Sequence, residues 1–256
     1  MLRAFFLPGR KYERGAVYMS NLWEQIRGNV KFLAVTIAIV VEIWLISKLI
    51  EHYLPGKRNV SPARRITIIG VCAAIATVLH IFDFPLPFLA PFFYKLDFSE
   101  VPVMLCSFYL GPTAAVACEA VKILLKLLLK STSTVFVGDF ANFVVGCSMV
   151  IPAALIYRLH RTKGGAVAGL LTGTLVMTAF GSLFNGIYLL PKFAELYGTS
   201  LEELVSIGTA INASIQSVTT LVIFAVVPLN LIKGLAVSLL TLLLYKHVAR
   251  PLFGRE

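Results

Sequence analysis

Charged residues are scarce in this chain of 256 residues, and acidic ones are the scarcest. Only 14% of the residues are charged, with 13 Asp and Glu against 23 Lys and Arg, whereas soluble domains average about 25% charged residues. Hydrophobic residues make up 58% of the chain, and its mean hydropathy is +0.84. A soluble domain is excluded by this composition. It predicts an all-α integral membrane protein, in which each span takes about 20 apolar residues.

Motifs for nucleotide hydrolysis and for common catalytic centres are missing as well. The sequence contains no G-x-x-x-x-G-K-[ST], no H-E-x-x-H and no G-x-S-x-G, so any ATP-dependent step would belong to a partner protein. Four histidines lie near predicted membrane boundaries, which favours an interfacial position for each: His52, His80, His160 and His247. We therefore do not expect an enzyme.

Cysteine is rare and shows no ligand spacing. The four thiols lie inside apolar segments without a CxxC or Cys/His pattern, which predicts buried free thiols rather than disulfides or a metal site: Cys72, Cys106, Cys118 and Cys147. The net charge of +10 comes from basic residues at the ends of apolar runs. That placement indicates membrane topology and anionic lipid head groups, and it argues against nucleic acid as a partner.

The apolar runs predict three parts. These are residues 1–65 with a basic tail, an extra hydrophobic helix and a linker, residues 66–248 with six membrane helices, and residues 249–256 as a cytoplasmic tail. Arg64, Arg65, Arg158 and Arg161 mark cytoplasmic connections. If Val30–Ile50 spans the membrane, the basic N-terminal residues lie outside, against the preference of basic residues for the cytoplasmic side. The alternative is that this helix lies in the membrane interface. We favour an added N-terminal helix.

Two connections on the outer side have local signals. The stretch "DFPLPFLAPFFYKLDFSE" contains too many prolines for a regular helix and predicts a long ordered loop at the membrane surface. Its lack of basic residues other than Lys95 places it outside. Further on, Ser200 and Glu203 form a capping-box pattern, so a short helix is expected to begin at Leu201.

Lysines at 122, 126 and 130 occupy one face of a predicted helix. Since like charges four residues apart repel, we expect them to extend to the interface or to meet Glu119 and other carboxylates. Where the outer loop enters a helix, Asp97 and Glu100 are predicted helix caps. The same role is predicted for Asp139.

Polar groups also interrupt the last apolar run. Asn230 and Lys233 share a helix face, although a charge at the bilayer centre costs roughly 2.5–3.5 kcal/mol. Pro228 leaves the carbonyl of Phe224 without its helical donor, and Gly234 provides room for a flat molecule. This face predicts a ligand site. The alternative is a structural ion pair from Lys233 to a carboxylate, with Glu119 and Asp139 as the candidates.

Small residues at four-residue spacing predict close helix contacts. One set is Gly70 with Ala74 and Ala73 with Thr77; the other is Gly165, Gly169 and Gly173. Such faces let membrane helices approach closely, either within the bundle or against a partner. The spacing alone leaves both possibilities open.

Several segments together resemble a known family. "FDFPLPF", "PFFYKLDFSEVPVMLCSFYLGPTAAVACEAVKILLK", "STSTVFVGDFANFVVGCSMVIPAALIY", "FGSLFNGIYLLP" and "VVPLNLIKG" resemble the substrate-binding S component of energy-coupling-factor (ECF) vitamin transporters, most closely the riboflavin type. The resemblance covers about Ile66 to Tyr245. It implies a multi-pass protein of a prokaryotic plasma membrane that binds riboflavin from outside, needs no cofactor, and docks on a transmembrane scaffold subunit carrying two ATPase subunits.

The resemblance also implies site residues. Ligand contacts carry over to Asn185, Asn230 and Lys233, whose amides and ammonium can match the acceptor, donor, acceptor edge of a flavin. The loop from Phe84 to Leu96 would gate the pocket, with further contacts predicted at Phe84, Leu86 and Lys95. From its position one turn inside a predicted span, Asn142 is expected either to form a hydrogen bond across helices or to contact the ligand. The predicted scaffold-facing residues are Gly70, Ala73, Ala74 and Thr77. Two rival interpretations stay open: the same fold with another vitamin, and a non-transport membrane interaction subunit.

Overall fold

The computed structural model describes residues 24, 26–54, 60–132 and 134–253, with side chains described up to Tyr245. The predicted basic tail before residue 24 lies outside the described residues, as do Lys57 and Arg58 of the linker and residues 254–256 of the cytoplasmic tail.

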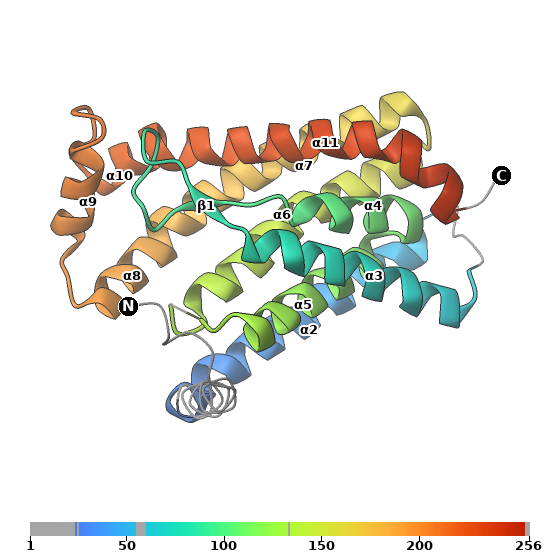
Figure 1. The fold of residues 1–256 in the computed structure, drawn as a ribbon, viewed down its shortest axis with the longest axis horizontal. Coiled ribbons are helices and arrows are strands. Elements are labelled where there is room, and N and C mark those ends of the chain that lie inside the picture. The colour runs from blue at the N-terminus through green and yellow to red at the C-terminus, as the bar shows by residue number, and fades with distance from the viewer. Residues whose placement is uncertain (1–23, 25, 55–59, 133, 254–256) are drawn as a thin grey trace, which may run out of the picture.

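Helices account for most of the described chain (Figure 1). In chain order they are α2 (Val30–Tyr53), α3 (Pro62–Ile81), α4 (Glu100–Leu110), α5 (Pro112–Leu129), α6 (Val137–Leu159), α7 (Lys163–Phe184), the π-helical turn η1 (Asn185–Leu189), α8 (Leu190–Tyr197), α9 (Leu201–Thr209), α10 (Val218–Leu221), the π-helical turn η2 (Val222–Val226) and α11 (Val227–Phe253). Helix α7 packs between α6 and α11, and α5 packs on α2, α3, α4 and α6. The loop that connects α3 to α4 (residues 82–99, the hairpin loop) lies with α8 and α9 at one end of the bundle, opposite the α6–α7 connection.

The prediction of an all-α membrane protein is confirmed. Five helical runs are long and apolar enough to cross a membrane: Val30–Tyr53, Pro62–Ile81, Val137–Leu159, Lys163–Tyr197 and Val218–Tyr245. Helix α5 has 18 residues and α4 is a shorter apolar helix of 11 residues, less than the roughly 20 residues of a complete span. Six complete crossings after Ile66 therefore stay a prediction.

The extra N-terminal helix is present, packs on α5 and touches both ends of α6. Near its start, the ring of Phe32 lies edge-on to Phe140 with centroids 6.0 Å apart. Near its end, Glu51 forms an ion pair with Arg158, at the other end of α6. Only 6% of its most apolar window is buried. Packing along α5, with contacts at both ends of α6, supports a spanning helix rather than one that lies in the interface.

Helix boundaries follow from local chemistry. Ser61 accepts a hydrogen bond from the backbone of Arg64 and Pro62 occupies the first turn of α3, a combination that starts helices. Gly111 separates α4 from α5 with φ +97°, a conformation that L side chains rarely adopt. The capping box of Ser200 and Glu203 is present, so the predicted start of α9 at Leu201 is confirmed.

The proline-rich stretch after α3 forms an ordered loop, as predicted. Within it, β1 (Phe84–Pro85) and β2 (Lys95–Leu96) pair antiparallel. The sequence did not predict this hairpin, because two residues per strand are too few for an alternating pattern. The strand pair brings both ends of the loop together beside the bundle.

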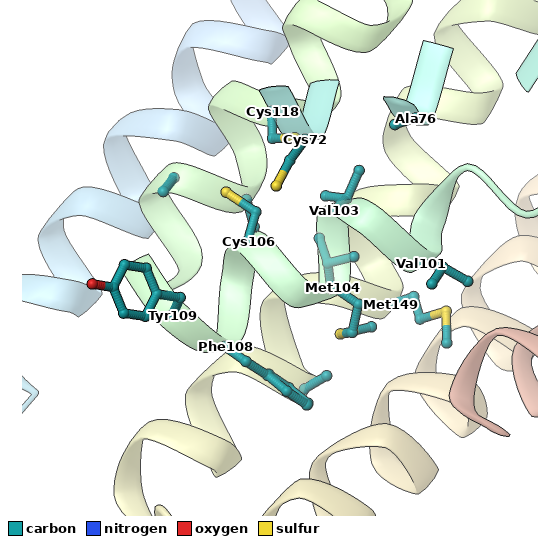
Figure 2. Close-up of a cluster of buried hydrophobic side chains, with 14 of the residues drawn as sticks. Cys72, Ala76, Val101, Val103, Met104, Cys106, Phe108, Tyr109, Cys118 and Met149 are labelled. Carbon is teal, nitrogen blue, oxygen red and sulfur yellow. The ribbon is translucent and has the colours of Figure 1, made fainter. Parts of the chain in front are cut away.

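The main core lies where α3, α4, α5 and α6 meet (Figure 2). The side chains of Cys72, Cys106 and Cys118 point into one cluster with Met104 and Met149. Cys147 belongs to a neighbouring cluster with Val116 and Phe143. All four cysteines are buried and free, which confirms their predicted role.

One of the two small-residue faces lies inside the bundle. A Cβ atom at Gly169 would lie 2.7 Å from the carbonyl oxygen of Ala153, and one at Gly173 would lie 2.5 Å from that of Met149. The glycines therefore allow α7 to approach the backbone of α6. For this face, contact within the bundle is the alternative that holds.

Candidate functional site

A cavity of about 400 Å³ lies beside the hairpin loop. Its lining combines aromatic rings from the loop with polar side chains from α3, α6, η1 and α11. Small-molecule sites typically measure about 300–1,000 Å³ and combine apolar walls with a few polar groups. Five of the seven predicted ligand residues line it: Lys95, Asn142, Asn185, Asn230 and Lys233.

The other two predicted ligand residues are not in the cavity lining. Phe84 is 40% exposed, and its ring lies 6.1 Å from that of Phe98. Leu86 packs against a further buried cluster, which includes Tyr94 and Phe193. Because the strand pair holds the start of the loop beside its end, the loop lines the cavity with Phe92, Phe93 and Tyr94 instead.

Asn185 is tied to the loop. The hydroxyl of Tyr94 donates a hydrogen bond of 2.6 Å to Oδ1 of Asn185, and both residues line the cavity. Burial raises the pKa of Tyr94, so the phenol stays neutral and remains a donor. Sequence reasoning missed Tyr94, since nothing in the loop distinguishes it from the aromatic residues around it. The bond fixes the loop against the wall that carries the amide.

Asn230 presents an unused donor. Its Nδ2 atom is buried and has no hydrogen-bond partner within the described part of the chain. The side chain packs over Gly181, where an added Cβ would lie 3.1 Å from Nδ2. A buried donor without an acceptor costs about 1–3 kcal/mol, and a ligand acceptor in the cavity would remove that penalty.

Lys233 both lines the cavity and forms ion pairs. Its ammonium lies 3.1 Å from Asp97 and 3.2 Å from Glu100. The predicted alternative partners, Glu119 and Asp139, are therefore wrong: they pair with Lys122 and Lys126. An ammonium has three donors, so two carboxylates leave one for a ligand.

These pairs belong to a larger buried network. Nδ1 of His80 lies 3.5 Å from Asp97, and Lys122 connects Glu100 to Ser99. Burial alone would raise the pKa of Asp97, but the charge of Lys233 and the neighbouring imidazole of His80 hold it well below its usual range. His80 is 4% exposed, so its predicted interfacial position is wrong.

The predicted caps have other roles as well. Asp97 accepts a hydrogen bond from the backbone of Ser99 through one oxygen, while its other oxygen faces Lys233. Glu100 pairs with two lysines. Asp139 lies within the first turn of α6 and bonds Lys126, without a side-chain cap. Buried ammonium groups compete with the helix N-termini for these carboxylates, because leaving a buried charge unpaired costs more free energy than leaving a helix end without a side-chain cap.

A second ionic group connects the loop to α5. Asp83 lies 2.8 Å from Lys130 and 3.2 Å from Lys95, and Lys126 pairs with Asp139 at 2.5 Å. Burial opposes ionisation of Asp83, but hydrogen bonds from Lys130 and Lys95 lower its pKa. The prediction that the lysines of α5 meet carboxylates is confirmed. Asn142, one turn into α6, donates to the carbonyl of Gly138.

Two π-helical turns position the asparagines. Turn η1 begins at Asn185 and ends two residues before Pro191; η2 ends two residues before Pro228, and the turns pack against each other. A proline deprives an upstream carbonyl of its donor, and a π turn adjusts the register around it. Gly234 does not provide ligand room: an added Cβ there would lie 2.5 Å from Thr174 of α7.

Of the four residues predicted to face a scaffold subunit, two are exposed and two are buried within the bundle. Gly70 and Ala74 are exposed on α3, with open space beside Gly70. Ala73 and Thr77 are buried, and the Thr77 hydroxyl donates to the carbonyls of Ala73 and Lys122. Since α3 packs on α5 through this face, Ala73 and Thr77 are wrong as partner contacts.

A membrane-spanning helical bundle with a partly polar cavity at one end is the architecture expected of a membrane protein that binds a small molecule. The comparisons then identify the family. Residues 64–245 match the family "ECF transporter, substrate-specific component". The chain belongs to this family, so it is a multi-pass membrane protein and a substrate-binding transport subunit rather than an enzyme.

Similar proteins support the assignment. The chain is 34% identical over 193 residues to riboflavin transporter RibU of Staphylococcus aureus, covering 75% of this chain and 94% of that protein. It is 29% identical to riboflavin transporter FmnP of Bacillus subtilis, covering 71% and 90%. A solved structure described as "Structure and mechanism of the S component of a bacterial ECF transporter" aligns with a TM-score of 0.58 and 36% identity, covering 74% of this chain and 97% of that one.

Proposed function

We propose that this protein captures riboflavin from outside the cell as the substrate-binding subunit of an ECF importer. The convergence of Asn185, Asn230 and Lys233 on one cavity is the observation that carries this function. The names of the similar riboflavin transporters support the choice of ligand.

The chemistry of the cavity suits a flavin. The pyrimidine edge needs donors and an acceptor, which the free donor of Asn230, the remaining donor of Lys233 and the Asn185 amide can supply. Aromatic rings of the loop suit the flat apolar part: Phe92 and Phe93 line the same cavity. Ribityl hydroxyls would then meet polar groups near Lys95 and Asn142.

Transport needs partners under this proposal. The sequence has no P-loop, so two ATPase subunits would hydrolyse ATP and a transmembrane scaffold subunit would contact this chain. Gly70 and Ala74 are the predicted residues that stay available on α3 for the scaffold. Small exposed residues on a membrane helix suit close approach of a partner helix.

The direct test measures what the purified chain binds. Riboflavin fluorescence should be quenched on titration with the detergent-purified protein, and riboflavin should copurify by absorbance and mass spectrometry. Asn230→Ala should weaken binding at least about tenfold, as expected for one lost hydrogen bond that leaves a ligand acceptor unsatisfied. Asn212→Ala, in the exposed loop after α9, is the control. Stabilisation by another vitamin in a thermal-shift panel, with none by riboflavin, would exclude the proposed ligand.

A further inference from the structure

The added helix α2 is anchored at the end that the basic residues assign to the cytoplasm. Oε1 of Glu51 lies 2.9 Å from a guanidinium nitrogen of Arg158, and its Oε2 accepts the backbone N–H of Thr113 at 3.2 Å. The side chains of Glu51 and Arg158 are 7% and 5% exposed. This contact fixes the end of α2 against the first turn of α5 and the last turn of α6.

Anchored in this way, α2 leaves a cleft beside α3. Helix α2 packs mainly on α5, and a cavity of about 660 Å³ lies between α2, α3 and α5. Small residues of α5 line it (Thr113, Ala114 and Ala117), facing aliphatic and aromatic side chains of the other two helices (Trp44, Leu45, Leu49, Ile66 and Ile69). Leu45, Leu49 and Ile66 of this lining are 51%, 59% and 71% exposed, so the cleft would be open to the hydrocarbon of a surrounding bilayer.

Cationic groups stand among these apolar walls. Lys48 is exposed on α2, and its ammonium lies 5.1 Å from the centre of the Trp44 ring. The side chain of Arg65 on α3 is 31% exposed and lies 4.0 Å from Glu51, whose carboxylate is closer to Arg158. One carboxylate is thus shared by two arginines, and Lys48 adds a further positive charge.

We infer that this cleft holds an anionic phospholipid, with one acyl chain against α5 and the phosphate near Lys48 and Arg65. Basic pockets between membrane helices on the cytoplasmic side suit anionic lipid head groups. A neutral lipid would fill the apolar cleft but leave the excess positive charge uncompensated. The site is separate from the cavity proposed for riboflavin, and it uses a helix outside the region that matches the family.

Native mass spectrometry of the detergent-purified full chain tests the inference. Phosphatidylglycerol is added in one arm and phosphatidylcholine with the same acyl chains in the other. The wild type should retain phosphatidylglycerol preferentially. Lys48→Gln should lower its apparent affinity about fivefold, and the double variant Lys48→Gln, Arg65→Gln roughly 25-fold, as expected for about 1 kcal/mol per basic residue. Equal binding of the two lipids, or unchanged affinity in the double variant, would overturn the proposal.

Matched variants separate this site from general charge effects. Lys31→Gln removes a lysine at the opposite end of α2 and should keep the preference. Ala117→Leu narrows the cleft without changing charge and should lower binding of both lipids; full binding in this variant would place the lipid elsewhere. Excess glycerol phosphate should not displace phosphatidylglycerol if the acyl chain is held. Riboflavin quenching should stay unchanged in Lys48→Gln, so failure of the lipid site and failure of the proposed function are distinguishable.

Discussion

Replacing Lys233 and replacing Asn230 should have different effects, although both residues line the proposed flavin cavity. Lys233 pairs with two buried carboxylates, and breaking a buried pair by removing one partner costs about 3–5 kcal/mol. Glu100 keeps Lys122 at 3.3 Å and Asp97 keeps His80 at 3.5 Å, so we expect the lower end, about 3 kcal/mol. At about 2–4 °C per kcal/mol, Lys233→Met should lower the Tm by about 6–12 °C.

Asn230→Ala should leave the unliganded protein at least as stable as the wild type. Its amide donor has no hydrogen bond to lose, and removing a buried donor that lacks an acceptor removes the penalty of about 1–3 kcal/mol that the donor carries. Its riboflavin affinity should nevertheless fall at least about tenfold. The two variants therefore separate support of the fold from contact with the ligand.

Thermal shift without ligand and fluorescence titration near 4 °C measure the two effects. Lys192→Met is a matched control, because Lys192 pairs with Glu195 on the surface and such pairs contribute about 0–1 kcal/mol. Adding Asp97→Asn to Lys233→Met should recover part of the lost Tm by removing an uncompensated charge. A wild-type Tm for Lys233→Met would refute the structural role of the ion pairs, and unchanged affinity of Asn230→Ala would refute the ligand contact.

Three further variants test other parts of the structure. Glu51→Gln should lower the Tm by several degrees because it removes the buried ion pair with Arg158 that holds α2. Glu42→Gln, at an exposed position on the same helix, should leave the Tm unchanged. Equal Tm values for the two variants would show that the ion pair is dispensable. Tyr94→Phe removes the bond that ties the loop to the cavity wall and should raise the riboflavin dissociation rate about 2–10-fold in stopped-flow fluorescence; an unchanged rate would contradict this role. Gly234→Ala should lower the Tm because it places a methyl group against α7. Gly70→Ala should leave the Tm unchanged because there is open space beside Gly70. The reverse order of Tm values would contradict the helix packing.

The sequence was sufficient for features that depend on local pattern. Apolar runs predicted the membrane helices, and the spacing of Ser200 and Glu203 predicted the start of α9. The periodicity of the lysines on α5 predicted a face that needs carboxylates. Each of these signals lies within a single helix or at its first turn, where spacing along the chain determines which side chains share a face.

Partners across the bundle could not be predicted in the same way. Lys233 and Asp97 are 136 positions apart, and several carboxylates were available to pair with the lysine. The electrostatic requirement for a partner could be predicted, since a membrane-buried ammonium needs compensation. Its identity depends on how α4 packs against α11. For the same reason, His80 belonged to the buried network although its position near a helix end suggested an interface.

The arrangement of the network explains how one lysine can serve both fold and ligand. Two carboxylates orient the ammonium of Lys233 and keep it charged without occupying all three of its donors. Asp97 directly follows β2 at the end of the hairpin loop, so the loop that supplies Tyr94 to the cavity also supplies a carboxylate that holds Lys233. Opening the loop far enough to move Asp97 would weaken the compensation of this charge. A closed loop and a correctly placed lysine therefore stabilise each other, which couples the entrance of the proposed site to its polar wall.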